Sequence, residues 1–151
     1  TQQIFGSEKI KPLGLSVPKV KLNNGVEMPM LGFGTNTLRG EVGVKSVKDA
    51  ISVGYRLIDT AKIYGNEDSV GEGIKNSGIN REELFLTSKL WVDDSGYDST
   101  KDAFELTLNK LGTDYLDLYL IHRPRGDVKG SWQAMEELYT EGNFDFSFYD
   151  L

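Results

Sequence analysis

Four residues whose side chains could together reduce a carbonyl group lie in three short segments of the chain. RLIDTAKIYG places Asp59 at the end of a short apolar run and Tyr64 five residues later, in the turn that follows. FLTSKLW carries Lys89, and YLDLYLIHRP carries His122, the only histidine in the chain. The four residues are expected at or just past the ends of three different strands, so they make a candidate active site.

Carbonyl reduction needs a hydride at the carbon, a proton at the oxygen and a group that stabilises charge on that oxygen. A free phenol has a pKa of about 10, and a neighbouring ammonium favours its ionised form. A carboxylate partner keeps that ammonium charged in a dry pocket. Tyr64 therefore suits the proton donor, with Lys89 and Asp59 as the pair that tunes it. His122 suits a second donor that orients the substrate oxygen.

Each of these residues also has a purely structural interpretation. A buried pair such as Asp59 with Lys89 between neighbouring strands is commonly structural. Tyr64 taken alone is more often a packed or surface aromatic, and His122 is more often a hydrogen-bonded loop residue. The catalytic interpretation gains weight because all four fall at strand ends in register.

The segments belong to a repeating pattern of strands and helices. The expected strand ends at Thr35, Asp59, Lys89 and His122 are 24, 30 and 33 residues apart. Strands that alternate with helices predict a parallel sheet with right-handed crossovers. The carboxyl ends of such strands converge where ligands bind. The predicted fold class is α/β, with four βα units that form a half barrel of the (β/α) TIM-barrel type.

Helices are predicted where apolar residues recur at helical spacing between the strands. The first is expected to stop at Gly54, and the second to open at Asn66, which two acids follow. The third is expected to open at Ser99 and the fourth at Ser131. On the fourth helix the residues expected to face the core are Trp132, Met135, Leu138 and Tyr139.

Residues 18–142 are predicted to form the folded unit. It begins with a β-hairpin that precedes the half barrel. Alternating residues around Asn23, Asn24 and Gly25 predict a ribbon from Lys19 to Met28. A lone hairpin is marginal in water, so it should lie against something larger. Residues 1–17 are predicted to be a flexible extension, and residues 143–151 an atypical aromatic tail that could hold a short strand.

Composition excludes several classes of protein. The net charge of −6 argues against nucleic-acid binding, and no apolar run approaches the roughly 20 residues that span a bilayer. The start of the chain, TQQIFGSEKIKPLG, lacks the apolar core of a secretory signal. Without cysteine and with one histidine, disulfides, thiolate metal sites and histidine-cluster metal sites are excluded. A cytoplasmic protein without a metal is expected.

The chain resembles the aldo-keto reductases at these segments. NNGVEMPMLGFGT resembles that family's hairpin and first strand, RLIDTAKIYGNEDSVGEGI its aspartate–tyrosine segment, FLTSKLW its lysine strand and LDLYLIHRP its histidine strand. The resemblance runs from about Val17 to Gly142. It implies reduction of aldehydes or ketones to alcohols with hydride from NADPH, NADH being the alternative.

The resemblance also implies a role for each matching residue. Tyr64 would be the general acid that Lys89 and Asp59 tune, and His122 would position the carbonyl. The cofactor would be bordered by Gly34, Thr35 and Asn36 together with Asp59, and the substrate pocket would be lined by Trp91 with Tyr64 and His122.

The resemblance covers only the first half of a barrel that typically has about 250 residues. A truncated chain is therefore expected, and the family's residues for the cofactor's adenosine phosphate would lie in the other half. No glycine-rich phosphate loop replaces them in this chain. The alternative function is a catalytically inactive half barrel that acts as an assembly or binding module. A flavodoxin-like binding domain is a third interpretation, but MLGFGTNTLRG has only part of a phosphate-loop glycine pattern.

A half barrel leaves two sheet edges unpaired and, by this interpretation, an apolar inner face uncovered. Unpaired edges and exposed apolar patches favour association. Self-association is therefore expected, in its simplest form as a two-fold dimer that pairs the open faces.

Overall fold

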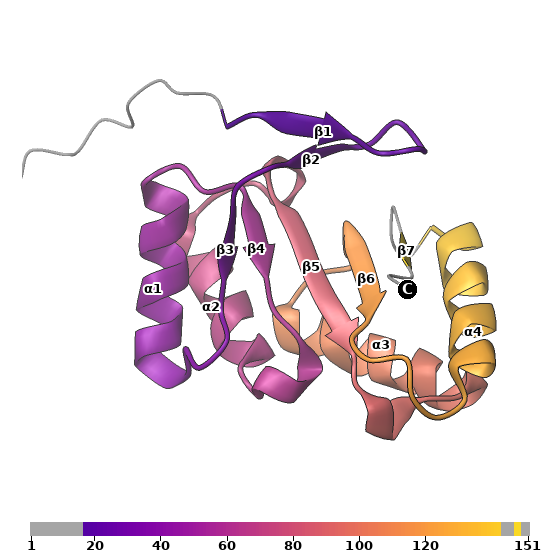
Figure 1. Cartoon of the computed structure of the whole chain (residues 1–151). Helices are drawn as coiled ribbons and strands as arrows, with labels where there is room; N and C mark the ends of the chain where they lie inside the picture. Colours follow the sequence, from indigo (N-terminus) through magenta and orange to yellow (C-terminus); the bar gives the residue numbers. More distant parts are fainter. Residues whose placement is uncertain (1–16, 143–146, 149–151) are drawn as a thin grey trace, which may run out of the picture.

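The computed structural model of the chain describes residues 17–142 and the strand at residues 147–148. Its main sheet has the strand order β3-β4-β5-β6-β7, and every neighbouring pair is parallel (Figure 1). Strands that follow one another in the chain are therefore neighbours in the sheet, as in the predicted half barrel. The strands are β3 (Gly32–Gly34), β4 (Leu57–Asp59), β5 (Phe85–Leu90), β6 (Leu118–Ile121) and β7 (Ser147–Phe148).

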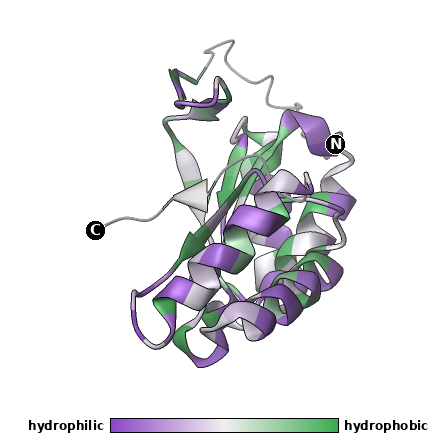
Figure 2. Cartoon of the chain, turned by 90° about the vertical axis from the view of Figure 1, so that its right-hand side faces the viewer, coloured by the Kyte–Doolittle hydropathy of each residue, from purple (hydrophilic) through white to green (hydrophobic). Residues whose placement is uncertain are grey.

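A helix follows each of the first four strands of this sheet, which confirms the four βα units. The helices lie on one side of the sheet, and Figure 2 shows hydrophobic residues concentrated along the strands. They are α1 (Gly40–Ser52), α2 (Glu67–Ser77), α3 (Tyr97–Leu111) and α4 (Val128–Thr140). Within the described part of the chain, none of them is long and apolar enough to cross a membrane.

The tail beyond residue 142 is described only at its two-residue strand. That strand, β7, pairs in parallel with β6, so the tail does contain a short strand. The predicted flexible extension lies outside the described residues except for Val17, and so do residues 143–146 and 149–151 of the aromatic tail.

Helix boundaries agree with the prediction at some ends and differ at others. Gly54, with φ 112°, follows the cap of α1 as predicted, and its N–H donates to the Ile51 carbonyl. Helix α3 begins at Tyr97 rather than Ser99, because Gly96 supplies the turn at φ 128°. Helix α4 begins at Val128 rather than Ser131, because the Asp127 carboxylate caps it by accepting a hydrogen bond from the Gly130 N–H.

The buried face of α4 was predicted with one error. Met135 and Leu138 are buried in the core, and Trp132 is half-buried. Tyr139 is 43% exposed. The prediction placed Tyr139 on the core face by its spacing from Met135. The last turn of α4 already meets the core through Leu138, and the tyrosine side chain stays partly exposed.

The helix-facing side of the sheet holds the larger part of the core. Ile58, Leu86 and Tyr119 project from three neighbouring strands into it and are at most 1% exposed. Each of the four helices contributes side chains to this core, and these include Val47, Val70, Phe104 and Met135. The strands therefore bury this face completely against the helix layer.

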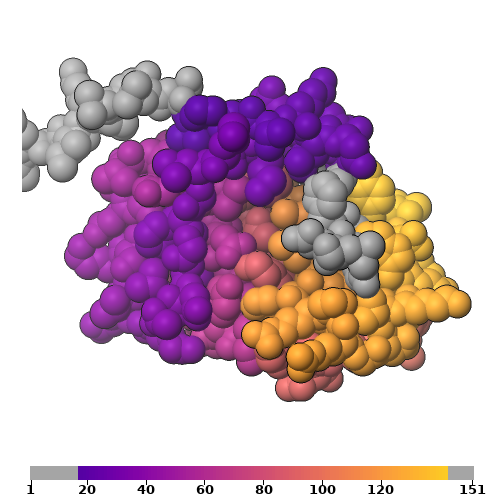
Figure 3. Space-filling model, viewed as in Figure 1, coloured from indigo at the N-terminus to yellow at the C-terminus, as the bar shows by residue number. Residues whose placement is uncertain are grey.

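The opposite, inner face of the sheet is closed at the start of the strands by the predicted hairpin of β1 (Lys19–Lys21) and β2 (Glu27–Pro29). In Figure 1 the hairpin lies along the end of the sheet where the strands begin, and Figure 3 shows its indigo atoms along the same end of the molecule. Its side chains Leu22, Val26 and Met28 pack against Leu57, Phe85 and Leu118. The expectation of an uncovered apolar inner face is thus wrong for this end of the sheet. At the other end the inward positions carry polar residues, which form the candidate site.

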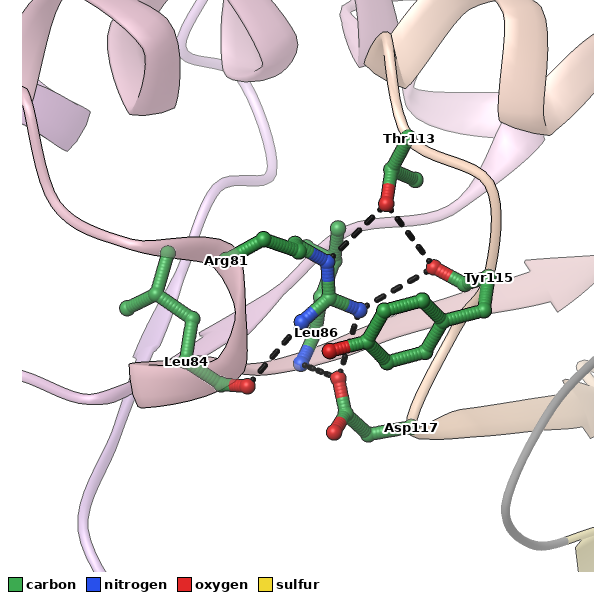
Figure 4. Close-up of polar contacts among 6 residues, drawn as sticks. All are labelled: Arg81, Leu84, Leu86, Thr113, Tyr115 and Asp117. Carbon is green, nitrogen blue, oxygen red and sulfur yellow. Dashed lines mark hydrogen bonds and ion pairs between the residues drawn. The ribbon is translucent and has the colours of Figure 1, made fainter.

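At the hairpin end, one arginine joins the loops that enter β5 and β6 (Figure 4). Arg81 belongs to the 3-10 turn Arg81–Glu83, and its guanidinium also stacks on the Tyr115 ring at 4.0 Å. Its hydrogen-bond acceptors are the Thr113 hydroxyl, the Leu84 and Tyr115 carbonyls, each at 3.0 Å, and the Asp117 carboxylate at 2.6 Å. Asp117 also accepts from the Leu86 N–H at 2.8 Å and so fixes the start of β5.

Replacement of this arginine should destabilise the fold. Arg81→Met leaves Asp117, which is 8% exposed, without the Arg81 cation and removes the guanidinium donors to the Leu84 and Tyr115 carbonyls, of which the second keeps the Thr113 hydroxyl. We expect the free energy of unfolding in urea to fall by about 2 kcal/mol. Lys45→Met is the control, because it breaks an exposed pair with Asp49 on one helix and should cost under about 0.5 kcal/mol. Equal losses in the two variants would contradict the role assigned to Arg81.

Candidate active site

The centre of the candidate site is an ion pair between neighbouring strands. Lys89 Nζ donates to both carboxylate oxygens of Asp59, each at 2.7 Å, and to the Thr60 carbonyl at 2.8 Å. These contacts use all three protons of the ammonium group. The Lys89 side chain is 13% exposed and that of Asp59 is 32% exposed. The pair therefore holds a positive charge at a fixed point near the end of β5.

Tyr64 and His122 lie beside this pair. Tyr64 ends the 3-10 turn Lys62–Tyr64, and the Lys89 ammonium is 5.2 Å from the centre of its ring. His122 directly follows β6, and its backbone N–H donates to the Leu90 carbonyl. The two rings meet edge to face with centroids 5.8 Å apart. All four residues that the sequence singled out are thus brought together from three different strand ends.

His122 is poised to remain neutral. Burial lowers its pKa below the ordinary value of 6.5, and the positive charges of Lys89 and Arg123 lower it further against the opposing effect of Asp59. Its Nδ1 atom is buried and has no hydrogen-bond partner among the described residues. A neutral imidazole can still donate one hydrogen bond to a ligand oxygen.

The lowered pKa gives a measurable pH dependence. The ring of His122 should titrate in the folded protein at a midpoint below 6.5, whereas in urea it should titrate near the ordinary value. Between the two midpoints the unfolded chain binds more protons. This contribution to stability is therefore complete above the unfolded pKa and is lost as the pH falls through the folded pKa. Because the chain has a single histidine, one NMR ring signal reports the result, and a midpoint at or above 6.5 would contradict it.

The other predicted residues surround this cluster in different ways. Trp91 lies against His122, with ring centroids 5.4 Å apart. Asn36 is exposed, and Gly34 pairs in register with Asp59 where a Cβ atom would meet nothing within 4 Å. Thr35 is instead fully buried, and both its N–H and its hydroxyl donate to the Asp59 carbonyl at 3.0 Å. Thr35 thus holds the backbone of Asp59 in place, while Gly34 leaves open space beside Asp59.

Sequence reasoning missed a buried residue that joins the site together. Asn66 is the cap residue of α2, as predicted, but its side chain makes no capping hydrogen bond. Its amide donates to the Thr35 and Leu38 carbonyls at 2.7 and 2.8 Å, and it accepts from the Thr60 hydroxyl at 3.0 Å. Capping rules alone assign this asparagine to the helix, so only the tertiary structure shows that it links the Tyr64 turn to the ends of β3 and β4.

Glu67 was also assigned only to the start of α2. In the structure it is 2% exposed, and its carboxylate accepts from the Ser88 hydroxyl at 2.7 Å and from the Thr107 hydroxyl at 3.4 Å. Ser88 precedes Lys89 on β5. The carboxylate thus fastens the segment after Tyr64 to the strand that carries Lys89. An acid in the first turn of a helix normally faces water, so its spacing gave no signal of burial.

Comparison with known proteins places this geometry in a family. The Aldo/keto reductase family model matches residues 30–144. The chain belongs to the aldo-keto reductases. It is 57% identical over 125 residues to the glyoxal reductase of Bacillus subtilis, covering 82% of this chain and 45% of that protein. It is 48% identical to the morphine 6-dehydrogenase of Pseudomonas putida, covering 83% of this chain and 43% of that protein.

Solved aldo-keto reductases share the fold. A reductase from Brucella melitensis superposes with a TM-score of 0.85 at 48% identity, covering 87% of this chain and 53% of the other. A Bombyx mori aldo-keto reductase in complex with NADP superposes with a TM-score of 0.80 at 36% identity, covering 88% of this chain and 50% of the other. The chain spans about half the length of the curated relatives that it matches.

The residues of this half barrel fit the nicotinamide end of a cofactor. The open space at Gly34 lies next to Asp59 on the inner face, where a flat ring could approach the cluster. The exposed Asn36 adds an amide at the edge of that space. When bound, a reduced nicotinamide supplies a hydride, and the residues of the chain would supply the proton and the positioning.

Proposed function

We propose that this chain forms the proton-donating half of a reductase that converts aldehydes or ketones to alcohols with NADPH, NADH being the alternative donor. The observation that carries the proposal is the convergence of Tyr64, His122 and the Asp59–Lys89 pair. A structural ion pair alone would not require a tyrosine and a neutral histidine beside it. The absence of cysteine fits a cytoplasmic location, which we propose for it.

The proposed mechanism assigns one task to each residue. A bound reduced nicotinamide would supply the hydride for the carbonyl carbon. The Tyr64 hydroxyl gives its proton to the carbonyl oxygen, and the fixed charge of Lys89 stabilises the phenolate that remains. Asp59 keeps Lys89 charged and in place through both carboxylate oxygens. His122 donates a hydrogen bond that orients the carbonyl, and Tyr64 regains its proton from solvent.

Turnover of a small dicarbonyl tests this proposal. Glyoxal is the probe, because a relative with 57% identity is a glyoxal reductase. We expect the absorbance of NADPH to fall when glyoxal is added and to stay constant in its absence. Absence of turnover with glyoxal and with simple aromatic aldehydes would contradict the reductase proposal.

The alternative is a catalytically inactive half barrel that serves as an assembly or binding module. The observation that favours it is that this sequence has no glycine-rich phosphate loop. A titration followed by NADPH fluorescence separates the two functions. Saturable binding supports the reductase, and no binding at millimolar NADPH supports the module.

We also propose that the half barrel self-associates. Among the described strands β3 has a neighbour on one side only, and the residues before it, Met30 and Leu31, are 70% and 54% exposed. Light scattering after size exclusion should give the mass of a dimer. Leu31→Glu should shift it toward the monomer, whereas Leu106→Glu, at a 45% exposed position of α3, should not. A wild-type monomer at all concentrations would contradict self-association.

A further inference from the structure

An exposed arginine stands at the edge of the candidate active site, directly after His122. The guanidinium carbon of Arg123 lies 5.6 Å from the centre of the Trp91 ring. The Trp91 ring in turn meets the His122 ring at 5.4 Å and 77°. Arg123, Trp91 and His122 therefore lie in a row of contacts, with the histidine proposed to orient the carbonyl at one end and a solvent-facing cation at the other.

Two lysines near the site are already paired. Lys89 is bound by Asp59. Lys62 pairs with Asp94, which joins the turn that carries Tyr64 to the 3-10 turn Val92–Asp94 after Trp91. Within residues 17–142, no ion pair links Arg123 to a carboxylate. In a chain of net charge −6, Arg123 thus carries a positive charge that no carboxylate among residues 17–142 pairs with.

The charge of Arg123 also reaches the site itself. It is one of the causes that lower the pKa of His122, after burial and Lys89. Stacking on Trp91 restrains the guanidinium, so less conformational freedom is lost when it binds a ligand. Its planar fork matches a carboxylate, which can accept two parallel hydrogen bonds.

We propose that Arg123 binds the carboxylate of the substrate, so that the preferred substrates are aldehydes or ketones that also carry a carboxylate group. This inference rests on the proposed reductase function. It assigns Arg123 to substrate selection and leaves the proton transfer to Tyr64.

Two substrates that share an aldehyde group but differ in the carboxylate test whether Arg123 recognises that carboxylate. The pair is para-carboxybenzaldehyde and its methyl ester, in which a neutral ester replaces the carboxylate remote from the aldehyde. For Arg123→Gln we expect kcat/KM to fall about tenfold for the acid, mainly through KM, and to stay within about twofold for the ester. Arg123→Lys should recover part of the loss, because it keeps the charge without the planar fork.

Arg125→Gln is the matched control, since Arg125 is also exposed and lies two residues further along the same loop. It removes the same charge from a residue that does not stack on Trp91. We expect it to change kcat/KM for the acid by less than about twofold. Equal losses for acid and ester in Arg123→Gln, or equal losses in the two arginine variants, would overturn the proposal.

A binding measurement separates this proposal from the proposed function. In a Trp132→Phe background Trp91 is the only tryptophan, because the chain has two. Benzoate should quench its fluorescence saturably, benzamide should not, and Arg123→Gln should weaken benzoate binding about tenfold. If the wild type reduces neither aldehyde, the reductase proposal fails, and this titration still decides the role of Arg123. No saturable quenching by benzoate, or equal affinity in Arg123→Gln, would overturn it.

Discussion

Tyr64→Phe should lower kcat for carbonyl reduction by about 10²- to 10⁴-fold, the contribution typical of a positioned general acid. The variant removes the one hydroxyl that can give a proton to the substrate oxygen. It keeps the ring that lies 5.8 Å from His122 and 5.2 Å from the Lys89 ammonium. The loss should therefore appear in kcat, with the affinity for NADPH unchanged.

Steady-state kinetics with glyoxal and a fluorescence titration with NADPH measure the two quantities separately. Tyr139→Phe is the control, since Tyr139 is exposed on α4 and should tolerate the same change without effect. Turnover near the wild-type level in Tyr64→Phe would remove Tyr64 from the mechanism. If Tyr64→Phe loses both NADPH binding and turnover, the hydroxyl instead positions the cofactor.

Asn66→Ala should cause a larger loss of stability than any of the variants at other positions. Asn66 is fully buried, and its removal leaves the Thr35 and Leu38 carbonyls and the Thr60 hydroxyl without this partner. Unsatisfied buried groups cost about 1–3 kcal/mol each, and partial relaxation reduces the total. We expect the free energy of unfolding in urea to fall by about 3 kcal/mol.

Two further asparagine variants serve as comparisons for this loss of stability. Asn66→Asp keeps the shape but sets a carboxylate against two carbonyl oxygens, so it should be at least as destabilising as Asn66→Ala. Asn76→Ala changes an exposed residue on α2 and should alter stability by less than about 0.5 kcal/mol. A loss in Asn66→Ala no greater than that in Asn76→Ala would contradict the structural role of Asn66.

The reacting cluster could be predicted from the sequence because strand ends in a parallel sheet converge. Asp59 ends β4, Lys89 is the penultimate residue of β5 and His122 follows β6, so their proximity follows from the repeat of the βα unit. Tyr64 could be placed in the turn beyond β4 for the same reason. The hairpin was predictable from Asn23, Asn24 and Gly25, since turn residues between alternating strands fix its position.

The contacts that support the cluster could not be predicted in this way. Asn66 and Glu67 have the residue types that a helix start prefers, and local rules account for both without burial. Their actual partners lie 21 to 40 residues away for Glu67 and 6 to 31 for Asn66, in segments that only the fold brings near.

The covered inner face was missed for a similar reason. Its closure depends on where the hairpin docks, and the alternation of residues 19–28 does not specify which end of the sheet it covers. In the structure Leu22, Val26 and Met28 bury the first inward residues of β4, β5 and β6. Closure of this end leaves the opposite end of the sheet for the polar cluster.

Deuterium transfer from NADPH tests most directly whether the chain reduces a carbonyl by hydride transfer. NADPH with deuterium in place of both hydrogens at its hydride-donating carbon should be mixed with glyoxal and the protein, and the alcohol product analysed by mass spectrometry. We expect one deuterium on the new alcohol carbon, because the hydride comes from the deuterated carbon of NADPH. An alcohol product without deuterium on carbon would contradict hydride transfer at this site, and so would the absence of any alcohol.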